Sequence, residues 1–559
     1  MNRKIFTLFV GFIVFSPLFA QNQTVGLFTY DTTIAEGYTL VAPFASHSTY
    51  LINNCGHEVH SWQSDYTPGA NAYLMPDGSL LRSGQVFSRF MEAGGNGGIL
   101  ERFNWNGDLV WSYQISNDTF SQHHDFEVMP NGNILVLIWE RIDRDTALNH
   151  GRKPELIMDS FIWSEKIIEI KPKGSNGADV VWEWRAMDHL VQDEYSDKED
   201  YGNISDYPER LDFNSPLINN MNDWLHFNSL DYNADLDQIL ISCHAFSELY
   251  IIDHSTSSSE SSGHFGGNHG KGGDILYRWG NPQVYGRGTV SERQLYKQHD
   301  AQWIPKGFPN ENKILVFNNG TERKYSSLDI IQPPTKPGSN TYVLEATKAY
   351  GPDAASYSYT GTPQSSFFTT NMGGVQPLKQ GGFFVCQSAS GRLFQINGDD
   401  EIVWDYTSPI TGKGPVDQGV KATGNAVFRS LKYPANYKAF ESVTLKDGLP
   451  LEGKYLYQFC DDTTGSAEPT DTTTHGGFVS LNATTSRVWP NPAGNQVHVE
   501  SDDILLCVNV LSLDGRTLIA TKLNDVRSTD LDLSNLSAGS YLVEVVQKDQ
   551  RSLIRLVRN

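Results

Sequence analysis

Residues 129–137 have the sequence Met-Pro-Asn-Gly-Asn-Ile-Leu-Val-Leu, a tight-turn motif followed at once by aliphatic residues. Residues 75–81, Met-Pro-Asp-Gly-Ser-Leu-Leu, repeat this pattern, and a longer version leads from residues 305–307 to the apolar run 313–317. Asn-Gly and Asp-Gly beside such runs are typical of β-hairpins. The repetition predicts an all-β fold made of strand-turn-strand units.

A second recurring feature is a strand that ends in an aromatic residue. Clear copies end at Trp62, Trp111, Trp182–Trp184, Trp279 and Trp404, and residues 357–359 form a weaker sixth copy. Six irregular repeats, with almost no helix-period segments, predict a six-bladed β-propeller over residues 21–460. A pair of large β-sandwiches is the alternative architecture.

Charge and composition exclude several functions. The 559 residues include 43 basic and 65 acidic side chains, a net charge of −22, and 12% of them are aromatic. Such a chain is neither disordered nor fibrous. A nucleic-acid partner is disfavoured because it would require a basic face. After the N-terminus, no apolar run reaches the roughly 18 residues of a membrane span, so none is predicted.

The N-terminus has the pattern of a secretory signal peptide. Arg3 and Lys4 precede an apolar run at 5–15, and Ala20 offers a small residue for cleavage, so residues 1–20 are predicted to be removed. The five cysteines are widely spaced and form no CxxC motif. Buried free thiols are the favoured prediction, and one disulfide remains open.

The C-terminal part changes character twice. Residues 461–486 are rich in Thr, Ser, Asp and Gly, which is typical of a linker. Residues 487–559 alternate apolar and polar side chains, which predicts a small antiparallel β-sandwich.

Four segments of this last domain carry a resemblance to a known family: 488–492 (Val-Trp-Pro-Asn-Pro), 513–516 (Leu-Asp-Gly-Arg), 536–543 (Leu-Ser-Ala-Gly-Ser-Tyr-Leu-Val) and the basic tail 551–559. They resemble the C-terminal sorting domain of the type IX secretion system. The resemblance implies passage across the outer membrane by that machinery, removal of the domain, and a secreted or cell-surface protein. A carbohydrate-binding sandwich is the alternative.

Histidines stand at the entrance of three predicted inner strands. They occur in 123–127 (His-His-Asp-Phe-Glu), 223–229 (Asp-Trp-Leu-His-Phe-Asn-Ser) and 298–303 (Gln-His-Asp-Ala-Gln-Trp). Inner strands of a propeller surround one axis, so these side chains are predicted to converge on one ligand. Imidazole can act as nucleophile, acid, base or metal ligand. A Zn²⁺ or Cu site is the less favoured alternative, because no short H-x-H or H-x₃-H pair occurs.

Together with residues 37–40, 50–52, 188–190 and 277–282, these motifs resemble the bacterial arylsulfate sulfotransferase family. The resemblance implies a six-bladed propeller that moves a sulfuryl group from an aryl sulfate to a phenol through a sulfated histidine. It implies no cofactor, and the chain has no Walker motif for a nucleotide donor.

The resemblance also assigns roles to individual residues. His299 matches the nucleophile, His124 a histidine that binds sulfuryl oxygens, and His226 with Asn228 the pair of a W-x-H-x-N motif. His244 stands where the family has an arginine. Histidine is cationic only below about pH 6.5 unless shifted. The missing charge is therefore predicted to come either from His244 or from one of three arginines: Arg278, Arg323 and Arg429.

Two other functions remain open at this stage: net hydrolysis of sulfate esters, and a non-catalytic surface propeller that binds glycans or proteins. Residues 263–273 also suggest a metal site, since this glycine-rich segment contains His264 and His269. A loop between blade strands is the favoured interpretation.

Overall fold

A computed structural model of the protein describes residues 23–218, 222–453, 486–491, 493–512, 517–547 and 551–558. They fall into two compact units, one within residues 21–460 and one within 461–559. Among the described residues, no helix is long and apolar enough to cross a membrane. The predicted signal peptide, most of the predicted linker, Cys460 and the 513–516 turn lie outside the described residues.

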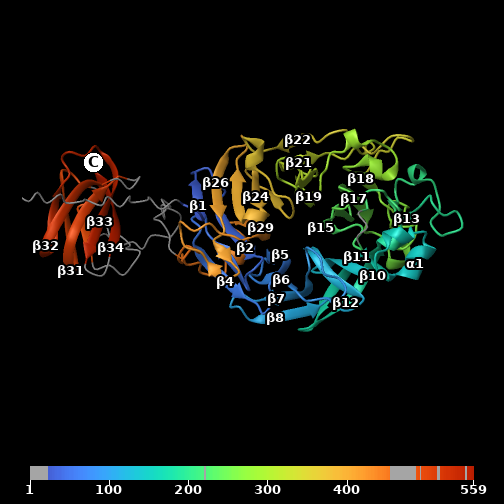
Figure 1. Ribbon diagram of the computed structural model, residues 1–559, viewed down its shortest axis with the longest axis horizontal. Helices are drawn as coiled ribbons and strands as arrows, with labels where there is room; N and C mark the ends of the chain where they lie inside the picture. The colour runs from blue at the N-terminus through green and yellow to red at the C-terminus, as the bar shows by residue number, and fades with distance from the viewer. Residues whose placement is uncertain are drawn as a thin grey trace, which may run out of the picture. The chain divides into compact units, whose positions relative to one another are not determined.

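The larger unit is a six-bladed β-propeller, as predicted. Each blade is an antiparallel sheet whose innermost strand lies near the propeller axis (Figure 1). The innermost strands are β5 (Pro68–Leu74), β9 (Phe120–Val128), β15 (Phe227–Asn233), β19 (His299–Trp303), β23 (Gly374–Pro377) and β29 (Val427–Pro434).

Three further strands complete each blade toward the periphery. The second strands are β6 (Leu80–Gln85), β10 (Ile134–Asp143), β16 (Gln238–Cys243), β20 (Ile314–Asn318), β24 (Phe383–Gln387) and β2 (Gly37–Pro43). The third strands are β7 (Gly98–Phe103), β11 (Phe161–Lys173), β17 (Glu248–Asp253), β21 (Ser327–Ile331), β25 (Arg392–Ile396) and β3 (Ser48–Ile52). The fourth strands are β8 (Leu109–Gln114), β12 (Gly177–Arg185), β18 (Tyr277–Trp279), β22 (Tyr357–Tyr359), β26 (Ile402–Thr407) and β4 (Glu58–Gln63).

Two contacts between the ends of the unit close the ring. The late strand β29 pairs with β2, so one blade combines its inner strand with the N-terminal strands β2, β3 and β4. The first strand, β1 (Gly26–Tyr30), pairs with β26 as a fifth, outermost strand of the preceding blade.

The recurring aromatic residues all lie on fourth strands. Trp62, Trp111, Trp182, Trp184, Trp279 and Trp404 are buried, and the weak copy 357–359 is β22 itself. These strands contribute to apolar clusters shared with the next blade, as Trp111 does with Phe126 and Ile134. The repeat was therefore visible in the sequence because each blade needs a large apolar group at its outer seam.

The inner strands share a second device, a β-bulge. The pairing of β9 with β10 skips from Gln122 to Phe126, and comparable shifts occur in β5, β15, β19 and β29. Bulges bend a strand and redirect its side chains. His124, at a φ of 47°, and Asp300, at 51°, lie in two of these bulges.

Short elements fill the connections between these strands. They are α1 (Arg144–Asn149), α2 (Ser258–Ser261), β13 (Leu190–Val191), β14 (Leu211–Asp212), β27 (Ile410–Thr411), β28 (Gly414–Pro415), and the 3₁₀ turns Pro154–Leu156, Ala186–Asp188, Ile204–Asp206, Pro282–Tyr285, Val290–Glu292, Gln364–Ser366, Ser388–Ser390 and Lys438–Phe440.

The smaller unit is one antiparallel sheet that curls around its own apolar core. Its strands are β30 (Ser486–Trp489), β31 (Gln496–Leu511), β32 (Thr517–Asp532), β33 (Gly539–Gln547) and β34 (Arg551–Arg558). The long β31 pairs with β30 and β32 at its start and with β32 and β33 at its end, which folds the sheet over buried Val499, Val510 and Leu556. The alternating pattern predicted a small antiparallel β-sandwich, and the unit is indeed a small antiparallel β domain, formed by one curled sheet.

The cysteine prediction holds only in part. Cys243 and Cys386 are buried free thiols and Cys507 is a half-buried one. Cys55, in contrast, is disulfide-bonded, so the favoured prediction of free thiols was wrong at this position. Wide spacing of the cysteines in the sequence gave no signal for this bond.

Candidate active site at the entrance of the inner strands

Four histidines predicted to act together form one continuous cluster. The ring centres of His124 and His226 are 4.6 Å apart, those of His226 and His244 5.1 Å, and those of His244 and His299 5.4 Å. The ring centre of Phe428, on β29, lies 6.0 Å from that of His124 and 6.4 Å from that of His299. Phe428 therefore lies between the first and last histidines of the row. Histidines from three different blades thus share one site, as the blade argument predicted.

His299 is held in a defined tautomer. Its Nδ1 lies 2.7 Å from Oδ1 of Asn319. The amide of Asn319 donates its two hydrogens to the carbonyls of Thr369 and Met372, at 3.1 and 2.7 Å, so Oδ1 must accept from His299. The Nε2 lone pair of His299 is therefore the free one, and it accepts only a long 3.2 Å bond from the Met372 amide.

Burial lowers the pKa of His299 to about 3, although the Asn319 bond opposes this. The imidazole is therefore neutral at neutral pH, with a lone pair on Nε2. That is the state a nucleophilic histidine requires.

His226 differs from its neighbours because it has a carboxylate partner. Its Nδ1 forms a very short contact with Oδ2 of the buried Asp223, whose other oxygen accepts from the His226 amide at 3.1 Å. Burial alone would lower the pKa of His226, but Asp223 outweighs it and raises the pKa. With about a fifth of its side chain exposed, His226 can carry positive charge and exchange protons with solvent.

His124 is connected through hydrogen bonds to two buried titratable groups. Nδ1 of His123 lies 2.9 Å from Nδ1 of His124, and Nε2 of His123 lies 2.9 Å from Oε2 of Glu165. Burial raises the pKa of Glu165 well above its usual range and lowers the pKa of His123 to about 3. A neutral Glu165 donates to His123, which donates to His124 and leaves its proton on Nε2. His124 is then a hydrogen-bond donor, as binding of sulfuryl oxygens requires.

His244 is not a cation in the free protein. Burial lowers its pKa well below the ordinary value, and positive charge on the neighbouring His226 and Lys297 lowers it further. Lys297 is itself a candidate for the positive charge. Its ammonium donates to the Ala245 carbonyl at 2.9 Å, beside His244.

Of the three predicted arginines, two are engaged with partners other than the histidines. Arg278, on the outer strand β18, is fully buried and paired with Glu248, and it also donates to the Arg210 carbonyl at 2.9 Å. Arg323 stacks over the Tyr296 ring at 5.0 Å and donates to Ser327 at 3.0 Å. These contacts suit structural roles.

Arg429 lies on the inner strand β29, next to Phe428. It contacts Asp125 and Asp300 at 3.0 Å each. Burial opposes its charge, but the two carboxylates raise its pKa. Arg429 therefore neutralises a buried carboxylate layer directly after the histidines, which limits the charge it can offer to a sulfate.

Asn228 holds two neighbouring blades together. Its amide nitrogen donates to the Gln298 carbonyl at 2.8 Å, which ties β15 to the residue before His299. Its Oδ1 is buried and makes no hydrogen bond in the part of the chain that the structure describes.

Sequence reasoning missed five residues that set the state of this cluster: Asn319, Asp223, Glu165, His123 and Lys297. Asp223, His123 and Lys297 lie within three residues of a predicted site residue, so proximity could have flagged them. Asn319 directly follows the second strand of its blade, and Glu165 lies on the third strand of another. Neither lies within three residues of a predicted site residue, so proximity could not identify them.

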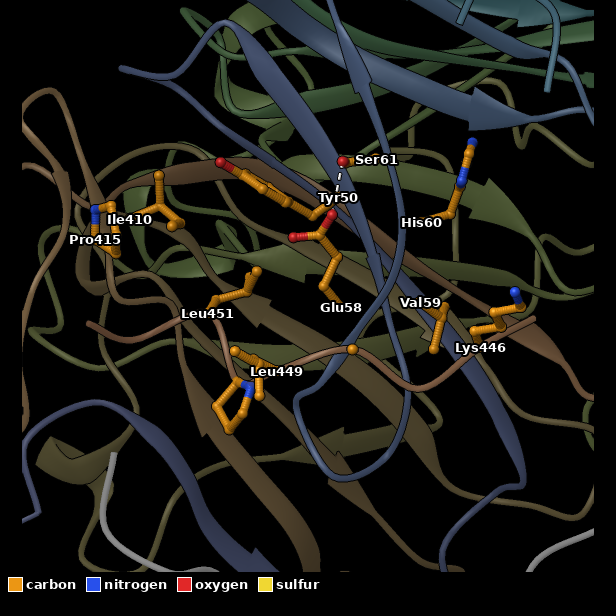
Figure 2. Close-up of a pocket in the computed structure, with 12 residues that line it drawn as sticks. Tyr50, Glu58, Val59, His60, Ser61, Ile410, Pro415, Lys446, Leu449 and Leu451 are labelled. Carbon is orange, nitrogen blue, oxygen red and sulfur yellow. Dashed lines mark hydrogen bonds between the residues drawn. The ribbon is translucent and has the colours of Figure 1, made fainter. Parts of the chain in front are cut away.

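A separate surface pocket of about 700 Å³ lies between the β3–β4 edge and residues 446–451 (Figure 2). Its walls include Tyr50, His60 and Leu449, and Ser61 donates to Glu58 at 2.7 Å. Its lining includes none of the predicted site residues.

Fold and site thus define a six-bladed propeller with a histidine cluster where its inner strands begin. A family model for arylsulfotransferase (ASST) matches residues 75–436, so the chain belongs to that family. A model for a secretion system C-terminal sorting domain matches residues 487–559, which indicates export to the cell surface or beyond. Family membership supports a sulfotransferase-type enzyme.

Other comparisons add only distant likenesses. No curated protein matches the chain. A protein of unknown function from Bacteroides caccae is 12% identical, with a TM-score of 0.39, over 71% of this chain and 99% of its own. Hydrazine synthase from Kuenenia stuttgartiensis is 12% identical, with a TM-score of 0.31, over 54% and 68%. Virginiamycin B lyase from Staphylococcus aureus is 10% identical, with a TM-score of 0.30, over 70% and 90%. These scores are too low to bear on function.

Proposed function

We propose that the protein transfers a sulfuryl group from an aryl sulfate to a phenolic acceptor through a sulfated His299, without a nucleotide donor. The observation that carries the proposal is the pairing of a neutral His299, its Nε2 lone pair left available by the Asn319 bond, with His226 two rings away, whose pKa Asp223 raises. A nucleophile and a proton donor with separated pKa values are what a two-step transfer needs.

In the first step, Nε2 of His299 attacks sulfur and the bond from sulfur to the aryl oxygen breaks. The departing phenolate takes a proton from His226. The N–S bond leaves the sulfuryl group on Nε2, while Nδ1–H still donates to Asn319. His124, Lys297 and the Met372 amide, released from its long bond to Nε2, stabilise the sulfuryl oxygens.

The second step is the reverse with a new phenol. Neutral His226 takes the phenolic proton, the oxygen attacks sulfur, and the N–S bond breaks. His299 and protonated His226 are thereby restored, so no net proton or electron is consumed.

The test measures phenol release from 4-nitrophenyl sulfate with and without an added phenol. Release that depends on the acceptor, together with an adduct on His299 with the mass of one sulfuryl group when donor is given alone, is the expected result. Release at the same rate without acceptor would indicate a hydrolase. No release and no adduct would leave a binding propeller as the better description.

A further inference from the structure

A second group of histidines lies around the loop between β17 and β18. Nδ1 of His189 and Nδ1 of His264 each lie 2.8 Å from the same oxygen, Oδ1 of Asp274. The three ligand atoms are all within 4.8 Å of one another. His264 and Asp274 come from the glycine-rich loop, while His189 follows the fourth strand of the preceding blade.

The hydrogen bonds of His189 show which ring nitrogen is turned toward Asp274. Its Nε2 lies 2.8 Å from the Ser261 carbonyl, which can only accept, so Nε2 carries a ring hydrogen. Nδ1 faces a carboxylate oxygen at 2.8 Å, and positive charge on this side of the ring, supplied either by a second ring proton or by a bound metal ion, satisfies both groups. A ring that donates to a backbone carbonyl and turns its other nitrogen to a metal is the usual pattern of a histidine ligand.

The surroundings hold this geometry firmly. His189 is fully buried and stacks on Trp184 with ring centres 5.4 Å apart, and the Trp184 indole donates to the Gly273 carbonyl at 2.7 Å. A Cβ on Gly273 would approach Nε2 of His189 to 2.6 Å, so only glycine allows the loop to lie so close. His264 is about a third exposed, which opens one side to solvent.

We propose that His189, His264 and Asp274 bind one divalent transition-metal ion of the zinc class. Two imidazoles and a carboxylate are donors that zinc accepts, and the exposed side leaves a fourth position for water. The bound ion would link the loop between β17 and β18 to the segment that follows β12 in the preceding blade. This inference does not depend on the proposed sulfuryl transfer.

The test is a metal titration of the full-length protein stripped with a chelator. We expect one Zn²⁺ per chain and, with Co²⁺, the visible absorption of a four-coordinate site. His264→Ala should weaken binding by about 100-fold or more, since loss of even an outer-shell partner costs roughly 10- to 100-fold. His269→Ala is the matched control, because His269 lies on the same loop but bonds to Gln238.

The active-site histidines are the other potential ligands, and His226→Gln tests them. Zinc should raise the melting temperature of wild type, His269→Ala and His226→Gln, but not of His264→Ala or Asp274→Asn. No bound zinc in the wild type, or equal binding by His264→Ala and His269→Ala, would overturn the proposal. Loss of binding only in His226→Gln would place the metal in the propeller site instead.

Discussion

The two histidine groups of this propeller differ in what their imidazoles face. In the axial cluster, formed by His124, His226, His244 and His299, the first, third and fourth rings lie beside other aromatic rings, and burial holds their pKa values far below the ordinary value. In the loop group, both imidazoles face Asp274. The first arrangement creates neutral donors and a nucleophile, and the second creates a place for a cation.

His226 shows that a single carboxylate decides between these outcomes. It belongs to the axial cluster, yet Asp223 gives it the opposite pKa shift from its neighbours. Residue type alone therefore does not distinguish catalytic histidines from histidines that bind a metal. The group that each imidazole contacts makes this distinction.

The largest effect is expected at His299. Removing a nucleophile costs on the order of 10⁴-fold or more in turnover. His299→Asn should therefore abolish acceptor-dependent release and adduct formation, while His264→Asn, in the other group, leaves turnover within about twofold. Circular dichroism of both variants checks the fold. Comparable losses in both would show that the two groups are not functionally distinct.

Asn319 gives the next largest effect, because it fixes the tautomer of His299. By analogy with a serine protease whose histidine loses its orienting partner, Asn319→Ala should lower kcat by about 10²- to 10⁴-fold. Asn319→Asp should recover much of this, because a carboxylate also accepts from Nδ1–H.

The carboxylate introduced by Asn319→Asp would also raise the pKa of His299 from about 3. The acid limb of kcat/KM should therefore move to higher pH in this variant. An unchanged acid limb would show that Asn319 supports the fold without controlling His299.

The pH profile separates His226 from the neutral rings. Its pKa is raised above 6.5, so the protonated form is present below that raised value and is lost as the pH increases through it. Since His299 stays neutral down to about pH 3, kcat/KM should show a broad acidic plateau and an alkaline fall.

Asp223→Asn should shift the alkaline fall to lower pH by about one unit or more, because the ion pair is lost. Asp159→Asn, which removes an exposed carboxylate bonded to Asn222, is the matched control. Identical alkaline limbs in all three proteins would exclude His226 as the proton donor.

Much of this could be predicted from the sequence. Turn motifs and fourth-strand tryptophans repeat along the chain, so blade number was visible. His124, His226 and His299 followed from their places at inner strands, and His244 from the family resemblance. The charge state did not follow, because it depends on how the backbone turns Asp223 toward His226 and on buried partners from other strands, such as Glu165 with His123. His244 illustrates the limit. The family comparison suggested a cation there, whereas burial among other imidazoles keeps it neutral.

Lys297 tests where the missing positive charge lies, with a smaller effect. Lys297→Met should lower kcat/KM by about 10- to 100-fold, and Lys297→Arg should retain most activity, because loss of one donor to the oxygens costs up to about 3 kcal/mol. Adding His244→Arg to Lys297→Met should restore activity by returning a cation to the adjacent position. Failure of the double variant, with the fold intact, would argue that the charge of Lys297 is not what matters.

The smallest effect on turnover is expected from metal removal, and it bears directly on the comparison of the two histidine groups. The proposed transfer uses donors from the protein and no metal ion, so prolonged chelation should leave kcat within about twofold at room temperature. The same treatment should lower the melting temperature, because a ligand that binds only the folded chain adds RT ln(1 + [L]/Kd) to stability, about 2.7 kcal/mol at roughly 100-fold excess over Kd. Zinc should restore the melting temperature in wild type and leave His264→Ala unchanged. A chelated enzyme that loses turnover at room temperature and regains it with zinc would instead place a metal among the axial imidazoles, and the neutral-nucleophile mechanism would fail.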